Sequence, residues 1–238
     1  MDNFSQNAER RHIVDNSAVN NFLTKMYSIM GLAVLVSALT AYLTLTVFAQ
    51  SFVRVMTSSS AALWLMLLLP LFLSMGISFR ANRNPVASFI MLMLIAVIYG
   101  FEFSILAFAY TSASLVSAFI SSAAVFIAMA VYGTVTKRDL STAGSYANAA
   151  LWGLIVATLV NMFLRSSAAT YIFSYIAVVI FLALTAWDAQ RMKQIYLTYG
   201  NQVSNLGLAV SGALQLYLDF VNLFLQFLQI FGYSDSNK

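Results

Sequence analysis

Seven long, mainly apolar stretches separated by short polar joints constrain the fold of this 238-residue chain more than any other feature. Most of them reach the ~20 residues that an α-helix needs to cross the hydrocarbon core of a bilayer. They occupy residues 23–49, 61–79, 86–110, 115–135, 146–164, 169–187 and 206–231. We therefore expect an all-α polytopic membrane protein with seven transmembrane helices, preceded by a polar N-terminal tail over residues 1–22.

Composition excludes several other classes of protein. Charged residues make up 8% of the chain, against about a quarter in soluble domains, so lipid must be the main solvent. The net charge of +4 does not indicate a nucleic-acid binder, because the basic residues are scattered between apolar runs. There is no cysteine, and the only histidine is His12 in the polar tail. We expect no catalytic site and no resident cofactor.

The distribution of lysine and arginine over alternate joints predicts the orientation. With the N-terminus in the cytoplasm, the inner segments hold nine basic residues and the outer segments hold three. The inner set is Arg10, Arg11, Lys25, Arg80, Arg83, Lys137, Arg138, Arg191 and Lys193, and the outer set is Arg54, Arg165 and Lys238. Because the number of spans is odd, we expect the C-terminus outside. A last run that failed to cross would return it to the cytoplasm.

Three acidic residues lie in or beside apolar runs: Glu102 in the third, Asp188 at the end of the sixth and Asp219 within the seventh. Ionisable groups inside a membrane are costly and are functional candidates by default. For Glu102 three readings stay open: a polar cavity, a pair with a basic residue, or a protonated buried acid. We expect its side chain to face the protein interior.

The spacing of the two aspartates relates them across a helical hairpin. If the sixth helix continues past Asp188 toward Tyr199 and the seventh begins near Leu206, both aspartates lie roughly 20 Å from the turn. Two carboxyl groups at one depth can face each other, and they cannot both ionise cheaply. The alternative is that Asp188 caps the inner end of the sixth helix in water.

A polar stripe follows one face of the last apolar run. Its members are spaced by three or four residues, and they are Ser211, Gln215, Asp219, Asn222, Gln226 and Gln229. Such a stripe must face other helices or water rather than lipid. The amides either join helices or line a conduction path, and these two readings stay open.

Three motifs resemble those of the Bax inhibitor-1 family, over the chain from about Leu23 to Gly232. They are LQLYLDFVNLFL around Asp219, LTAWDAQ around Asp188, and YG followed by TKRDLS, which resembles the bacterial branch. The resemblance implies a bacterial inner-membrane protein whose last helix is enclosed by the other six. It also implies that Asp188 and Asp219 form a di-aspartyl pair controlling a pH-sensitive calcium leak, with weak and transient Ca²⁺ binding.

The same resemblance implies an arginine near the inner end of the second helix that bonds to the aspartates. Arg80 is the match and Arg83 the alternative. The sequence departs from the family pattern at Trp187, where the family usually has tyrosine, and at Glu102, where relatives have serine or threonine.

The function predicted first is therefore a pH-sensitive, calcium-permeable leak channel whose partners are the bilayer and Ca²⁺ or other cations. One alternative is a proton-coupled ion carrier that uses the same acids. Another is an interaction protein that modulates a membrane protease or a cell-death or stress pathway. An intramembrane aspartyl protease is disfavoured, because Leu216-Tyr217-Leu218 rather than Gly-x-Gly precedes Asp219.

Overall fold

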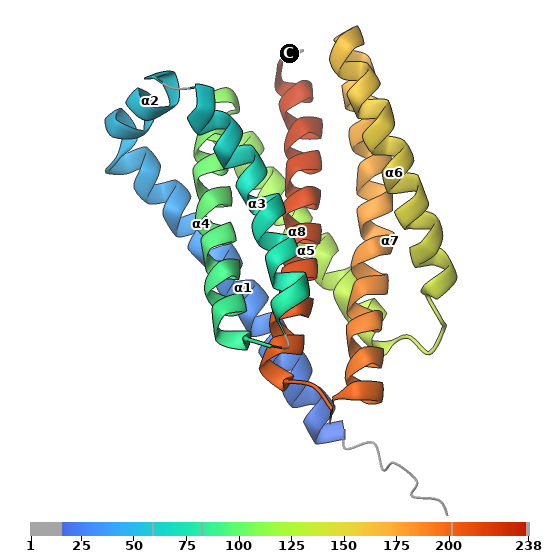
Figure 1. Cartoon of the computed structure of the whole chain (residues 1–238). Coiled ribbons are helices and arrows are strands. Elements are labelled where there is room, and N and C mark those ends of the chain that lie inside the picture. Colours follow the sequence, from blue (N-terminus) through green and yellow to red (C-terminus); the bar gives the residue numbers. More distant parts are fainter. Residues whose placement is uncertain (1–15, 59, 82, 201, 237–238) are drawn as a thin grey trace, which may run out of the picture.

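The computed structural model describes residues 16–236 except residues 59, 82 and 201 (Figure 1). The described residues form eight helices and no strand. The helices are α1 (Asn16–Thr46), α2 (Ala49–Ser58), α3 (Ser60–Arg80), α4 (Pro85–Ala109), α5 (Ser112–Val135), α6 (Ser141–Leu164), α7 (Ser167–Tyr199) and α8 (Asn205–Ser236). Six are long and apolar enough to cross a membrane, and α3 contributes the shorter apolar stretch Leu68–Phe79. The all-α polytopic fold is confirmed.

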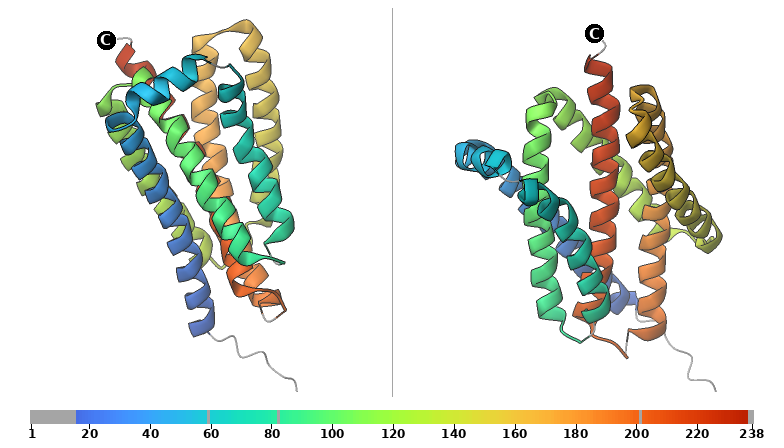
Figure 2. Two further views of the ribbon diagram at one scale, coloured as in Figure 1. Left: turned by 60° about the vertical axis from the view of Figure 1, so that its left-hand side comes forward. Right: turned by 45° about the horizontal axis from the view of Figure 1, so that its top comes forward.

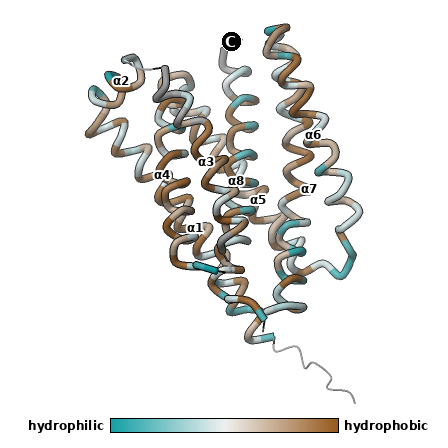
Figure 3. The backbone as a smooth tube through the Cα atoms, viewed as in Figure 1, coloured by the Kyte–Doolittle hydropathy of each residue, from teal (hydrophilic) through white to brown (hydrophobic). Residues whose placement is uncertain are grey.

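The long helices run side by side, and the two ends of the described chain lie at opposite ends of the bundle (Figures 1 and 2). The start of α1 and the turn between α7 and α8 share one end, here called the inner end because the charge pattern predicts that it faces the cytoplasm. The C-terminal end of α8 marks the outer end. Hydrophilic residues gather at the inner joints, whereas the middle of the bundle is mostly hydrophobic (Figure 3).

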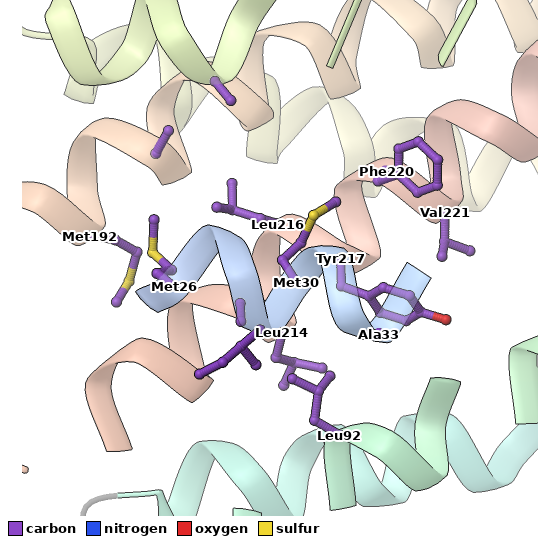
Figure 4. Packing of buried hydrophobic residues seen from close by; sticks show 14 of the residues in the cluster. Met26, Met30, Ala33, Leu92, Met192, Leu214, Leu216, Tyr217, Phe220 and Val221 are labelled. Carbon is purple, nitrogen blue, oxygen red and sulfur yellow. The ribbon is translucent and has the colours of Figure 1, made fainter. Parts of the chain in front are cut away.

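Helix α8 is the central helix of the bundle. Of its apolar stretch 72% is buried, against 11–33% for the other five spans of this length. It contacts α1, α3, α4, α5 and α7, while α6 packs along α7. Figure 4 shows Leu216 and Tyr217 of α8 among Met30 of α1 and Leu92 of α4. Burial on all sides explains why this helix is apolar around most of its circumference.

Glycines allow the helices around Asp188 to approach closely, as small residues do in membrane proteins. Gly133 of α5 lies against the backbone of Ala186, and Gly144 of α6 lies against the Trp187 ring. A Cβ atom at either glycine would overlap with α7. The segment of α7 that carries Asp188 is therefore tightly packed between α5 and α6.

Two parts of the structure differ from the sequence prediction. Helix α1 begins at Asn16, inside the predicted tail, because Val19 and Phe22 are buried and Phe22 stacks on Tyr196 with ring centroids 4.3 Å apart. Residues 49–58, predicted mostly as a joint, form the amphipathic helix α2. Its Phe52 packs on Phe101 of α4, as in helices that lie at a membrane surface.

Candidate functional site

The hairpin of α7 and α8 brings the two membrane aspartates together. Helix α7 runs on to Tyr199 and α8 begins at Asn205, so Asp188 lies three turns inside its helix. The reading of Asp188 as a helix cap in water is therefore wrong. The turn is closed by a hydrogen bond from Gln202 N to Tyr199 O (2.8 Å) and by one from Gly207 N to Ser204 Oγ (3.2 Å).

The carboxyl groups of Asp188 and Asp219 lie within hydrogen-bonding reach and act on each other electrostatically. Asp219 is 6% exposed, and its Oδ2 atom has no hydrogen-bond partner within the described part of the chain. The structure thus places the pair at one depth, as the hairpin spacing predicts. Two carboxyl groups so close in an apolar setting are expected to hold one proton between them and to titrate as a unit.

The positive charge that acts on Asp188 comes from Arg191, one helical turn further along α7. Its guanidinium lies over the Trp187 ring, 5.1 Å from the centroid. Sequence reasoning missed this residue, although the i, i+3 spacing from Asp188 was a usable signal. Of the two arginines expected there, Arg83 is exposed in the joint between α3 and α4, and the side chain of Arg80 lies outside the described residues.

Glu102 is half-buried on α4 and belongs to a different cluster. It acts electrostatically on Tyr99 and Tyr217. The hydroxyl groups of Tyr217 and Ser37 share a hydrogen bond of 2.6 Å. The structure therefore places Glu102 beside a tyrosine–serine cluster between α1, α4 and α8 rather than in the aspartate pair.

The polar stripe of α8 faces α7 and a cavity of about 300 Å³ between α6, α7 and α8. Asn222, Gln226 and Gln229 line this cavity. Gln229 also joins helices, because its Oε1 atom accepts a hydrogen bond from Ser174 Oγ (2.7 Å). Further inward, Ser211 and Gln215 are partly buried, and Gln215 Oε1 has no partner among the described residues. Some residues of the stripe therefore line a cavity, and Gln229 also joins two helices.

Gln190 organises the inner side of the site, and sequence reasoning missed this role. The side chain is buried, its Nε2 atom donates to Arg138 O (2.7 Å), and its Oε1 atom accepts from Leu140 N (2.8 Å). Lys193 Nζ donates to Thr134 O (2.8 Å) at the end of α5. Helix α7 thereby holds the joint between α5 and α6 two residues beyond Asp188.

The model of the family described as "Inhibitor of apoptosis-promoting Bax1" matches residues 19–236. The chain belongs to the Bax inhibitor-1 family. This match confirms the resemblance inferred from the three motifs, including the stretches that carry Asp188 and Asp219.

Bacterial members of the family are similar over most of their length. The uncharacterized protein YrjE of Lactococcus lactis is 37% identical over 223 residues, covering 94% of this chain and 95% of the relative. An uncharacterized membrane protein of Streptococcus pyogenes serotype M3 is 38% identical over 217 residues, covering 91% and 94%. The inner membrane protein YbhL of Escherichia coli is 44% identical over 146 residues, covering 59% and 61%. The names of the Streptococcus pyogenes and Escherichia coli relatives agree with the membrane fold.

Proposed function

We propose that this member of the Bax inhibitor-1 family is a pH-sensitive, calcium-permeable leak channel of the cell inner membrane. The observation that carries the proposal is the pairing of Asp188 and Asp219 inside a hairpin whose second helix is enclosed by the bundle. Ca²⁺ favours carboxylate and carbonyl oxygens. Two carboxylates without a full ligand cage suit the weak binding that conduction requires.

The pair supplies both the cation site and the pH switch in this proposal. With one shared proton, a hydrogen bond ties α7 to α8 and holds the path closed. Loss of that proton at higher pH leaves two negative charges that repel each other, which favours opening. Full protonation at low pH removes the charge that attracts a cation. The aspartates thus exchange protons and cations and catalyse no reaction.

Arg191 sets the pH at which the switch operates. Its positive charge favours the ionised form of Asp188, to which it lies close. We expect Arg191→Gln to move the rise of the flux curve to higher pH without removing it. Because the stacking of Arg191 on Trp187 is lost as well, Arg191→Lys serves as a comparison that keeps the charge.

The test is ion flux through the purified protein in liposomes, with Ca²⁺, Na⁺ and K⁺ compared between about pH 5 and 8, a range set by perturbed carboxyl groups. We expect Ca²⁺ flux to rise with pH in the wild type, and Asp219→Asn to lose both flux and pH dependence. Asp139→Asn makes the same chemical change at a fully exposed site and should leave flux unchanged.

Three results would redirect the proposal. Equal flux and equal pH profiles for the wild type and Asp219→Asn would remove the pair from the mechanism. Flux that saturates and requires a proton gradient would indicate a proton-coupled carrier, which uses the same acids as a relay. Absence of flux of any of these ions would leave the interaction protein as the remaining reading.

A further inference from the structure

Two neighbouring cavities occupy the outer half of the α6–α7–α8 region. The first is the cavity of about 300 Å³ described above, and the second, of about 420 Å³, lies against the start of α7 and the last turns of α8. Thr170 and Gln229 line both, so the two cavities adjoin. Helices α6 and α7 lie on one side of α8, and α1, α3 and α4 on the other (Figure 1).

The first cavity contains polar groups that the protein itself leaves unpaired. Gln226 forms no hydrogen bond within the described part of the chain, and it lines the cavity. Asn222 donates from Nδ2 to Leu218 O (2.8 Å), which leaves its Oδ1 atom available to the cavity. Amide groups without partners at membrane depth are costly unless water reaches them. A volume of about 300 Å³ has room for several waters, each of which takes about 30 Å³ in the liquid.

The polar part of the lining indicates which solutes the space suits. None of the described residues that line the two cavities is charged, and their polar groups are amides and hydroxyls. Neutral oxygen ligands replace part of the hydration shell of a cation without holding it tightly. Asp219 is three residues inward of Asn222 on the same face of α8, about 4.5 Å along the helix axis. The next acidic residue inward of Asn222 on this face of α8 is therefore Asp219.

We propose that the two cavities form a hydrated outer vestibule through which a small cation reaches Asp188 and Asp219. The vestibule ends near Asn222 and Phe181, the α7 lining residue nearest in sequence to Asp188. The identity of the ligand as a cation rests on the leak function proposed above. Hydration of the vestibule does not, because it is measured without ion flux.

The test uses the absence of cysteine in the native chain. Single variants Gln226→Cys and Asn222→Cys are reconstituted in membranes and treated with a membrane-impermeant cationic thiol reagent, applied to each side in turn. Leu228→Cys is the matched control, because Leu228 lies near Gln226 on α8 but is 1% exposed and packs in an apolar cluster. We expect the reagent, applied from the outer end, to modify Gln226→Cys at least about tenfold faster than Leu228→Cys, since thiolate accessibility controls the rate.

A depth series defines the inner limit of the vestibule. Asn222→Cys should react more slowly than Gln226→Cys, and Gln215→Cys should be protected from the outer side. A cationic reagent should react faster than an anionic reagent of similar size at both positions. The ratio of the two rates should be larger at Asn222→Cys than at Gln226→Cys, because position 222 is closer to Asp219. Denatured samples of all variants should react equally, which controls for intrinsic reactivity.

The outcomes separate this proposal from the leak function. If Gln226→Cys reacts no faster than Leu228→Cys in the folded protein, the vestibule is wrong, even when the liposomes show the proposed Ca²⁺ flux. If labelling follows the depth series but the wild type conducts no ion, the hydrated vestibule stands and its role as a cation path is wrong.

Discussion

The inner and outer halves of the α7–α8 hairpin use similar polar residues in opposite ways. In the inner half, the buried amide of Gln190 makes two hydrogen bonds to the joint between α5 and α6. In the outer half, Gln226 has no partner among the described residues and faces a cavity. The same side chain thus fixes structure where the protein supplies its partners, and faces open space where the protein does not.

Packing follows the same division. Around Asp188, Gly133 and Gly144 bring α5 and α6 against the backbone and the tryptophan ring of α7. In the outer half, α6 packs on α7 while a cavity separates it from α8. The aspartate pair lies between a tightly packed inner region and a loosely packed outer one. In the leak channel proposed above, a gate at this position needs no separate plug.

The largest effect on stability is expected from filling the closest contact of the inner half. In Gly133→Ala the new Cβ atom meets the backbone of Ala186, and backbone cannot swing aside as a flexible side chain can. Overpacking of this kind costs about 1–3 kcal/mol. The measurement is the free energy of unfolding in mixed micelles. Gly153→Ala on α6 is the control, because nothing lies within 4 Å of the position that its new Cβ atom would take, and equal stabilities would contradict the tight inner packing.

A smaller effect should distinguish the two amides. Gln190→Ala leaves Leu140 N and Arg138 O without their side-chain partner, and we expect a loss of about 1 kcal/mol, since water near the joint offsets part of the penalty. Gln226→Ala should stay within about 0.5 kcal/mol of the wild type, because it removes no protein hydrogen bond. The same unfolding measurement applies, and a larger loss at Gln226 than at Gln190 would reverse the comparison.

The smallest effect is expected at the inner end, at Asp139. Hydrogen bonds from the backbone N–H and the hydroxyl of Ser141 lower the pKa of this exposed carboxyl below its ordinary value of 3.8. Because the pKa is lowered on folding, the stabilisation is present above the ordinary value and is lost as the pH falls through the folded value. Asp139→Asn should therefore lower the thermal midpoint slightly at neutral pH. At strongly acidic pH the two proteins should melt together, and a difference that persists there would contradict this role.

Sequence reasoning predicted the parts of the molecule that depend on local pattern. The apolar runs predicted the seven long helices, and the equal spacing of Asp188 and Asp219 from the turn predicted their pairing. Helix α2 was missed because a ten-residue amphipathic helix has the average polarity of a joint. The bonds of Gln190 and the cavity around Gln226 depend on how closely separate helices approach, and no spacing along one helix contains that information.

The central claim is that Asp188 and Asp219 hold one proton between them and that its loss opens the leak. Infrared difference spectroscopy of the protein in lipid membranes tests this most directly, because a protonated carboxyl group absorbs separately from a carboxylate. The claim predicts one carboxyl band that disappears over the same pH range in which Ca²⁺ flux rises, and that Asp188→Asn and Asp219→Asn each change this band together with the pH profile of the flux. A band that is unchanged in both variants, or that titrates in a range where flux stays constant, would contradict the account.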